Sequence, residues 1–136
     1  MRLELYLQET ATQAEKHRRL LKSAATRLEN GSLSELEQQG VLHSLQVIIE
    51  NAIGKARHLL KANNQTVPVS AYDVITAATE NNILPKDQSS EWAAVIGLRN
   101  RIVHDYLNVD FAVIEGLMKE KRYSLVLDFL TKKETA

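Results

Sequence analysis

The sequence predicts an all-α fold, a single bundle of four to five helices that occupies the whole chain, residues 1–136. Three observations predict it. Apolar residues recur at three- and four-residue spacing through long segments, as they do on one face of a helix. Capping and turn residues separate these segments. The composition, 44% hydrophobic and 25% charged, is typical of a globular domain, and no repeat or linker divides the chain.

Two long helices are expected in the first half of the chain. Asn30 and Gly31 can end the first helix by supplying a left-handed residue after its last turn. Ser34 and Glu37 then form a capping box, which satisfies free backbone donors at the start of the second helix. The second helix has an apolar stripe suited to antiparallel packing, made by Leu42, Leu45, Ile49, Ala52, Ala56 and Leu59.

The third and fourth helices follow a break near Pro68. Ser70 can cap a short third helix through Ala71 to Glu80. Residues 81–90, which contain a proline, are expected to form a loop. A fourth helix begins after Ser89 or Ser90 and runs through the sequence LRNRIVHDY, residues 98–106.

The fifth helix is expected after an interruption at residues 107–110, where Asp110 can act as its N-cap. It is expected to continue to Phe129. Residues 123–129 taken alone could form a strand, but the surrounding helix-forming residues favour a helix.

Composition and charge exclude several classes of protein. The chain has no cysteine, so it has neither a disulfide framework nor a thiolate metal site. The charged N-terminus lacks the apolar core of a signal peptide, and no apolar run approaches the roughly 20 residues that cross a bilayer. We therefore expect a cytoplasmic protein without a membrane partner.

Basic and acidic residues are balanced at 17 each, so net charge does not predict binding to nucleic acid. Two basic runs occur, at residues 16–27 and 55–61. Such runs are most often solvated helix faces, and the alternative is a local phosphate-binding surface.

Arg99 interrupts the apolar face of the fourth helix. A guanidinium is almost never fully buried without a partner, so this position predicts a carboxylate, a second subunit, a cleft or a phosphate beside it. The other members of that face are Trp92, Val95, Ile96, Val103 and Tyr106.

Polar residues surround Arg99. Asn100 and His104 are four residues apart, so the amide can orient the imidazole, and Arg101 can pair with Asp105 at the same spacing. Arg99 and His104, in contrast, differ by about 140° around an ideal helix. They can act on one substrate if the arginine curls round, if the helix distorts, or if two copies of the motif meet. This geometry favours a symmetric dimer, and Gly97 would allow a neighbouring helix to approach closely.

The pattern Arg99-x-x-x-x-His104-x-Tyr106, with Asn100 directly after the arginine, resembles the signature of HEPN domains. It is most similar to the HepT-like toxins encoded beside minimal nucleotidyltransferases. The chain length, the long first helices and Trp92 before the motif agree with that resemblance.

The resemblance implies metal-independent cleavage of RNA by a homodimer, without a cofactor. Arg99, Asn100 and His104 would be the catalytic residues, because an imidazole moves protons near neutral pH and a guanidinium stabilises phosphate charge. The resemblance also implies that Tyr106 accepts AMP from a nucleotidyltransferase antitoxin, which neutralises the toxin. His17, His43 and His58 lack metal-ligand spacing, so zinc is not expected.

Two alternatives remain at this point. The chain can be a non-catalytic helical module that binds a nucleotidyltransferase. It can also be a histidine phosphotransfer bundle that uses His104, although such a histidine should project from mid-helix beside a lysine, and here the close basic neighbours are arginines.

Overall fold

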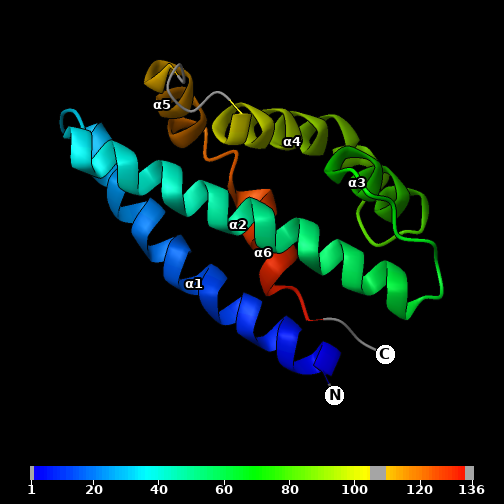
Figure 1. Cartoon of the computed structure of the whole chain (residues 1–136). Coiled ribbons are helices and arrows are strands. Elements are labelled where there is room, and N and C mark those ends of the chain that lie inside the picture. Colours follow the sequence, from blue (N-terminus) through cyan, green and yellow to red (C-terminus); the bar gives the residue numbers. More distant parts are fainter. Residues whose placement is uncertain (1, 105–109, 134–136) are drawn as a thin grey trace.

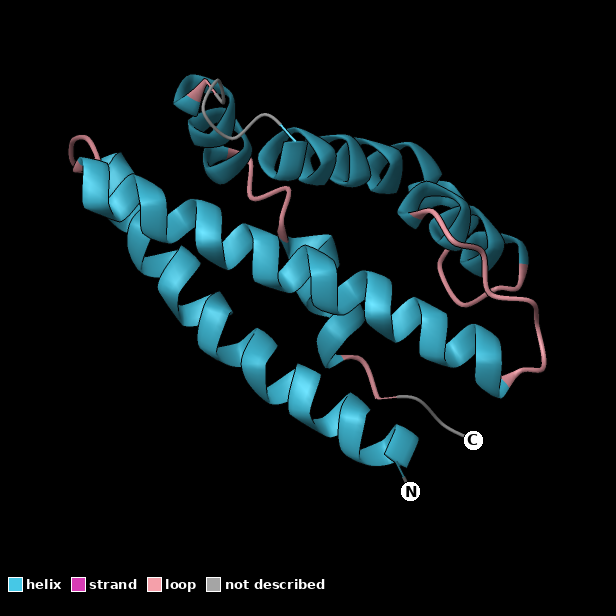
Figure 2. Cartoon of the chain, viewed as in Figure 1, coloured by secondary structure: helices cyan, strands magenta, loops and turns pink. Residues whose placement is uncertain are grey.

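The computed structural model describes residues 2–104 and 110–133, and every regular element in these two ranges is helical (Figure 2). The α-helices are α1 (Arg2–Glu29), α2 (Glu35–Ala62), α3 (Ala71–Glu80), α4 (Ser89–His104), α5 (Phe111–Lys119) and α6 (Ser124–Thr131), with a short 3-10 helix at Lys86–Gln88. The predicted all-α class is thus confirmed.

The long helices α1 and α2 form an antiparallel pair, and the shorter helices pack around it (Figure 1). Helix α6 contacts both α1 and α2. Helices α3 and α4 contact each other, and both lie against α2. Helix α5 contacts α1, near the turn that joins the two long helices (Figure 1). Helix α2 is therefore the central element, on which the other helices assemble.

Side chains cap the helices where the sequence predicts it. Ser34 Oγ accepts from the Glu37 backbone N–H at 3.1 Å, and Glu37 Oε1 accepts from the Ser34 backbone N–H at 2.8 Å, which completes the capping box. Ser70 caps α3 through the backbone N–H of Asp73, and Asp110 caps α5. These bonds satisfy backbone donors that a helix leaves free at its start.

The end of α1 differs from the expectation. The helix stops at Glu29, but Gly31 does not adopt positive φ. The side-chain amide of Asn30 instead donates to the Thr26 carbonyl at 3.1 Å, so an ordinary hydrogen bond satisfies a free carbonyl of the last turn. Left-handed residues occur after α2 and α3, at Asn64 and Asn82.

The predicted fifth helix is two helices, which gives six α-helices in the described ranges instead of four to five. Helix α5 ends at Lys119, and Lys121 adopts φ of 55° before α6 begins at Ser124. Four consecutive charged residues at 119–122 interrupt the apolar stripe, so this turn has no face to bury. Residues 124–129 are helical, as the surrounding residues predicted.

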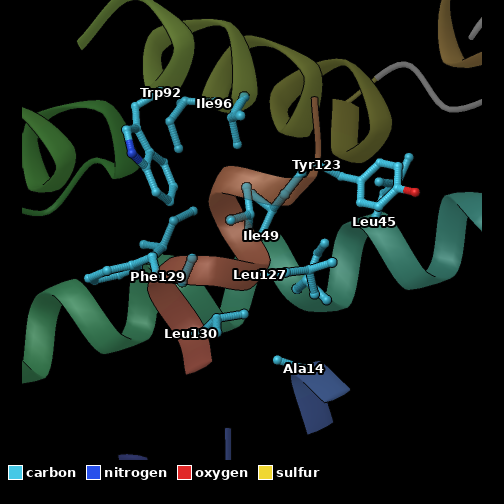
Figure 3. Close-up of a cluster of buried hydrophobic side chains, with 14 of the residues drawn as sticks. Ala14, Leu45, Ile49, Trp92, Ile96, Tyr123, Leu127, Phe129 and Leu130 are labelled. Atoms are coloured by element: carbon cyan, nitrogen blue, oxygen red, sulfur yellow. The ribbon is translucent and has the colours of Figure 1, made fainter. Parts of the chain in front are cut away.

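The core lies where α2, α4 and α6 meet (Figure 3). The Trp92 ring is fully buried and packs edge-on against Phe129, with 5.7 Å between ring centroids. Beside them on α2, Lys55 is also buried, and its Nζ donates to the carbonyls of Phe129 and Lys132 at 2.5 and 3.1 Å. This lysine therefore fastens the C-terminal end of α6 to the central helix.

Some members of the two basic runs make contacts within the chain, whereas others, such as Lys16 and Lys22, are exposed. Arg18 pairs with Asp128, and Arg27 pairs with Glu37. Arg57 donates to the Val69 carbonyl at 2.9 Å. Neither run is simply a solvated face.

Candidate active site on helix α4

Helix α4 buries one face against α2 and α3 and leaves the other open. Trp92, Val95, Ile96 and Ile102 are buried. Val103, expected on the same face, is 38% exposed. Ile102 and Val103 lie on opposite sides of Arg99 around an ideal helix, and the last turn of α4 has core packing only on the Ile102 side.

Arg99 lies in the middle of the buried face, and its partner is a carboxylate. Its Nε donates to Glu50 Oε1 on α2 at 2.5 Å, and its Nη1 donates to Asn100 Oδ1 at 3.0 Å. The side chain is 24% exposed, so the guanidinium is held at the surface between two helices and keeps access to solvent. Of the partners that the sequence left open for Arg99, the structure shows a carboxylate, that of Glu50.

Sequence reasoning missed Glu50. The signal that could have found it is its place next to Ile49, in the apolar stripe of the second helix, followed by a long stretch without another acidic residue. An acid beside one apolar stripe and a base within another are complementary when the two stripes face each other. The pairing itself could not be read from sequence, because the two residues are 49 positions apart.

Asn100 has a different partner from the expected one. Its amide oxygen accepts from Arg99, and among the described residues no hydrogen bond joins Asn100 to His104. His104 is exposed and is the last described residue of α4. Asn100 therefore orients the arginine in this structure, and the imidazole is presented to solvent.

Arg99 and His104 point in different directions from α4, as the angle of about 140° predicts. Gly97 and His104 are seven positions apart, which brings them within about 20° of each other around the helix. Gly97 lines a groove of about 880 Å³ between α4 and α5, together with Leu98, Arg101, Val113 and Gly116. His104 thus lies on the Gly97 side of α4, although it is not among the residues that line the groove.

This groove side is unoccupied around Gly97. A Cβ built on Gly97 would meet nothing within 4 Å, so no helix of the same chain approaches it in the described ranges. Val113, across the groove on α5, is 49% exposed. This face therefore carries small side chains, is partly apolar and is open to solvent.

Two predicted residues fall outside the described ranges. Tyr106, the expected AMP acceptor, and Asp105, the expected partner of Arg101, belong to residues 105–109. The first three residues of the expected interruption at 107–110 lie there as well, whereas Asp110 is described as the N-cap of α5.

The remaining histidines have structural contacts. His17 on α1 is buried, and its Nδ1 lies 2.9 Å from Ser44 Oγ on α2. Burial lowers the pKa of His17, and the charge of Lys16 and the nearby His43 lower it further. His58 packs against Tyr6, whose pKa is raised by burial. Within the described ranges, no three histidine or carboxylate side chains are grouped so that they could hold a metal ion.

No helix in the part of the chain that the structure describes is long and apolar enough to span a membrane.

Comparison with known proteins agrees with the motif. A family model described as Ribonuclease HepT-like matches residues 8–132. The "mRNA nuclease HepT" of Shewanella oneidensis is 35% identical over 78 residues, which cover 56% of this chain and 59% of that protein.

Solved structures show the same fold. A tri-AMPylated HEPN toxin of Shewanella oneidensis, in complex with an MNT antitoxin, superposes with a TM-score of 0.79 at 18% identity, covering 94% of this chain and 98% of that one. A mutant MntA–HpeT toxin–antitoxin structure gives a TM-score of 0.79 at 18% identity, covering 94% and 99%. Since the family model spans most of the sequence and the fold agrees along nearly its full length, the chain belongs to the HepT-like family of HEPN proteins.

Proposed function

We propose that this protein is the toxin of a toxin–antitoxin pair and that it is a metal-independent endoribonuclease. The observation that carries the proposal is that α4 holds both a partly buried, hydrogen-bonded Arg99 and an exposed His104. The Shewanella relative named mRNA nuclease HepT supports RNA as the substrate class.

RNA carries its own nucleophile, the 2′-hydroxyl, so the protein needs to move protons and stabilise charge. His104 accepts the proton of the 2′-hydroxyl, because imidazole exchanges protons near neutral pH. The oxygen attacks the adjacent phosphorus, and Arg99 donates hydrogen bonds to the non-bridging oxygens as their charge grows. Asn100 fixes the guanidinium. The bond to the 5′-oxygen then breaks, which leaves a 2′,3′-cyclic phosphate and a 5′-hydroxyl.

A symmetric homodimer would complete this site. One imidazole takes a proton, whereas the departing 5′-oxygen needs one, and a second copy supplies a second His104. The open side of α4 around Gly97 supports this arrangement, because His104 lies on the same side of the helix as Gly97. Light scattering should give a dimer at micromolar concentration. Val113→Glu should weaken the dimer, whereas Leu36→Glu, on a side chain 83% exposed near the start of α2, should not.

A nucleotidyltransferase is the proposed antitoxin, and Tyr106 is the proposed acceptor of AMP. The structurally similar toxin of Shewanella, which is AMPylated and bound to an MNT antitoxin, supports this proposal. Phosphate on Tyr106, two residues after His104, would place negative charge beside the residues that should receive RNA phosphate.

The direct test is to incubate the purified full chain with RNA in excess chelator and analyse the product ends. Wild-type protein should yield cyclic phosphate and 5′-hydroxyl ends, and His104→Ala should abolish cleavage. His43→Ala is the matched control, since His43 is also exposed but lies away from α4. Absence of cleavage in chelator with AMP transfer intact would instead support the non-catalytic binding module.

A further inference from the structure

The contact between α2 and α4 suggests a role for a residue that the motif does not contain. We infer that Glu50 is a positioning residue of the proposed ribonuclease site: its carboxylate holds Arg99 by Nε and leaves the outer end of the guanidinium for an RNA phosphate. This inference rests on the proposed function. It adds to the site a residue from a different helix.

The hydrogen bonds of Arg99 are divided in a way that suits this role. An arginine has five N–H donors in a planar fork. Nε–H is used by Glu50, and Nη1 gives one hydrogen bond to Asn100. The guanidinium is thus held from two helices, by Glu50 on α2 and by Asn100 on its own helix, α4. Within residues 2–104 and 110–133 no group accepts a hydrogen bond from Nη2, so a phosphate can bind its two donors without displacing Glu50.

Glu50 lies on a well-packed part of α2. Its neighbours Ile49 and Ile53 are 2% and 1% exposed, and α2 contacts α1, α3, α4 and α6. A long arginine side chain is flexible by itself, and catalysis needs it in one geometry before the reaction starts. A carboxylate fixed on the central helix supplies that constraint, as a supporting residue should.

The opposite role for Glu50 is a counter-ion that blocks the phosphate site. A blocking carboxylate would occupy the outer end of the fork, whereas Glu50 Oε1 contacts Nε. The two roles also predict opposite effects of Glu50→Gln. This variant keeps an oxygen that can accept from Nε–H but removes the charge. Loss of a blocking charge raises cleavage, and weakening of a positioning contact lowers it.

The kinetic test uses Glu50→Ala, Glu50→Gln and a control, Glu35→Gln, which removes an exposed charge near the start of the same helix. Glu50→Ala should lower kcat about tenfold or more and change KM less than about threefold, because misplaced groups affect the reacting geometry more than binding. Glu50→Gln should fall between wild type and Glu50→Ala, and the control should match wild type. All variants should keep the wild-type unfolding midpoint to within a few degrees. An unchanged or raised kcat, or a change in KM alone, would overturn the inference.

A second measurement does not depend on cleavage. The Nε–H resonance of Arg99 in a ¹⁵N NMR spectrum of the full chain, assigned with Arg99→Lys, should shift in Glu50→Ala and stay in place in Glu35→Gln. If the resonance shifts but the wild type does not cleave RNA, the proposed function fails while the contact stands. If wild type cleaves and Glu50→Ala leaves the resonance unmoved, the positioning role is wrong.

Discussion

The substitution Arg99→Lys tests whether the site needs the shape of a guanidinium or only a positive charge. Lysine keeps the charge but carries its donors on one terminal nitrogen, without Nε and without a planar fork. It therefore cannot reproduce the contacts of Arg99 with Glu50 and Asn100 and at the same time bond two phosphate oxygens. We expect Arg99→Lys to lose most of its RNA cleavage activity, although less than Arg99→Ala loses.

The expected loss follows from the role of the arginine in stabilising charge. Removing one preorganised donor to a developing oxyanion lowers kcat by roughly 10² to 10³, or about 2.7–4 kcal/mol. Arg99→Lys should lie near the lower end of that range, because the positive charge remains, and Arg99→Ala at or beyond the upper end.

Stability should change much less than activity. The Arg99 and Glu50 side chains are 24% and 43% exposed, so solvent screens their interaction. Loss of such a pair costs about 1 kcal/mol or less. In a chain of this length that corresponds to a fall in Tm of roughly 2–5 °C. A variant that is folded at assay temperature yet about a hundredfold slower would separate the catalytic effect from unfolding.

The assay is single-turnover cleavage of end-labelled RNA in chelator, with Tm measured on the same preparations. If Arg99→Ala cleaved RNA at the wild-type rate, Arg99 would have no catalytic role. Retention of more than about a third of the wild-type rate by Arg99→Lys, with Arg99→Ala inactive, would show that a positive charge alone suffices. The planar fork of the guanidinium, with its contacts to Glu50 and Asn100, would then not be needed for cleavage.

Three further predictions concern control and stability. Tyr106→Phe should cleave RNA normally but gain no AMP when co-expressed with the partner nucleotidyltransferase, and an AMP mass increment on this variant would exclude Tyr106 as the acceptor. Burial lowers the pKa of His17, so the stability that its neutral ring supports is complete above about pH 6.5 and declines as the pH falls towards the folded-state pKa. His17→Gln should weaken that dependence in urea unfolding between pH 5.5 and 7.5, and an unchanged dependence would contradict it. Lys55→Met should lower the free energy of unfolding by about 2–4 kcal/mol, because charge-assisted bonds to the carbonyls of Phe129 and Lys132 are lost, and a change below about 0.5 kcal/mol would contradict that role.

Local chemistry made most of the secondary structure predictable. The capping box at Ser34 and the caps at Ser70 and Asp110 lie within a few residues of the donors that they satisfy. The recurrence of apolar residues predicted the long helices for the same reason, since neighbours on a helix face are three and four residues apart. The Arg99, Asn100 and His104 motif was also visible, because its members share one helix.

Other features depended on contacts between segments distant in the chain. Whether α5 and α6 are one helix or two was decided by which apolar faces find a partner in the core, and the charged turn at 119–122 has none. The same holds for His17 and Lys55, which lie in basic runs but are buried because α1, α2 and α6 pack together there.

For the candidate site, the periodicity of one helix was enough to predict that Arg99 needs a partner and that His104 points elsewhere. The packed structure was needed to show that the partner is Glu50 and that Asn100 binds the arginine instead of the histidine. A salt bridge between helices depends on their crossing and on the offset of their turns. Those are properties of the packed core as a whole, and no short stretch of sequence encodes them.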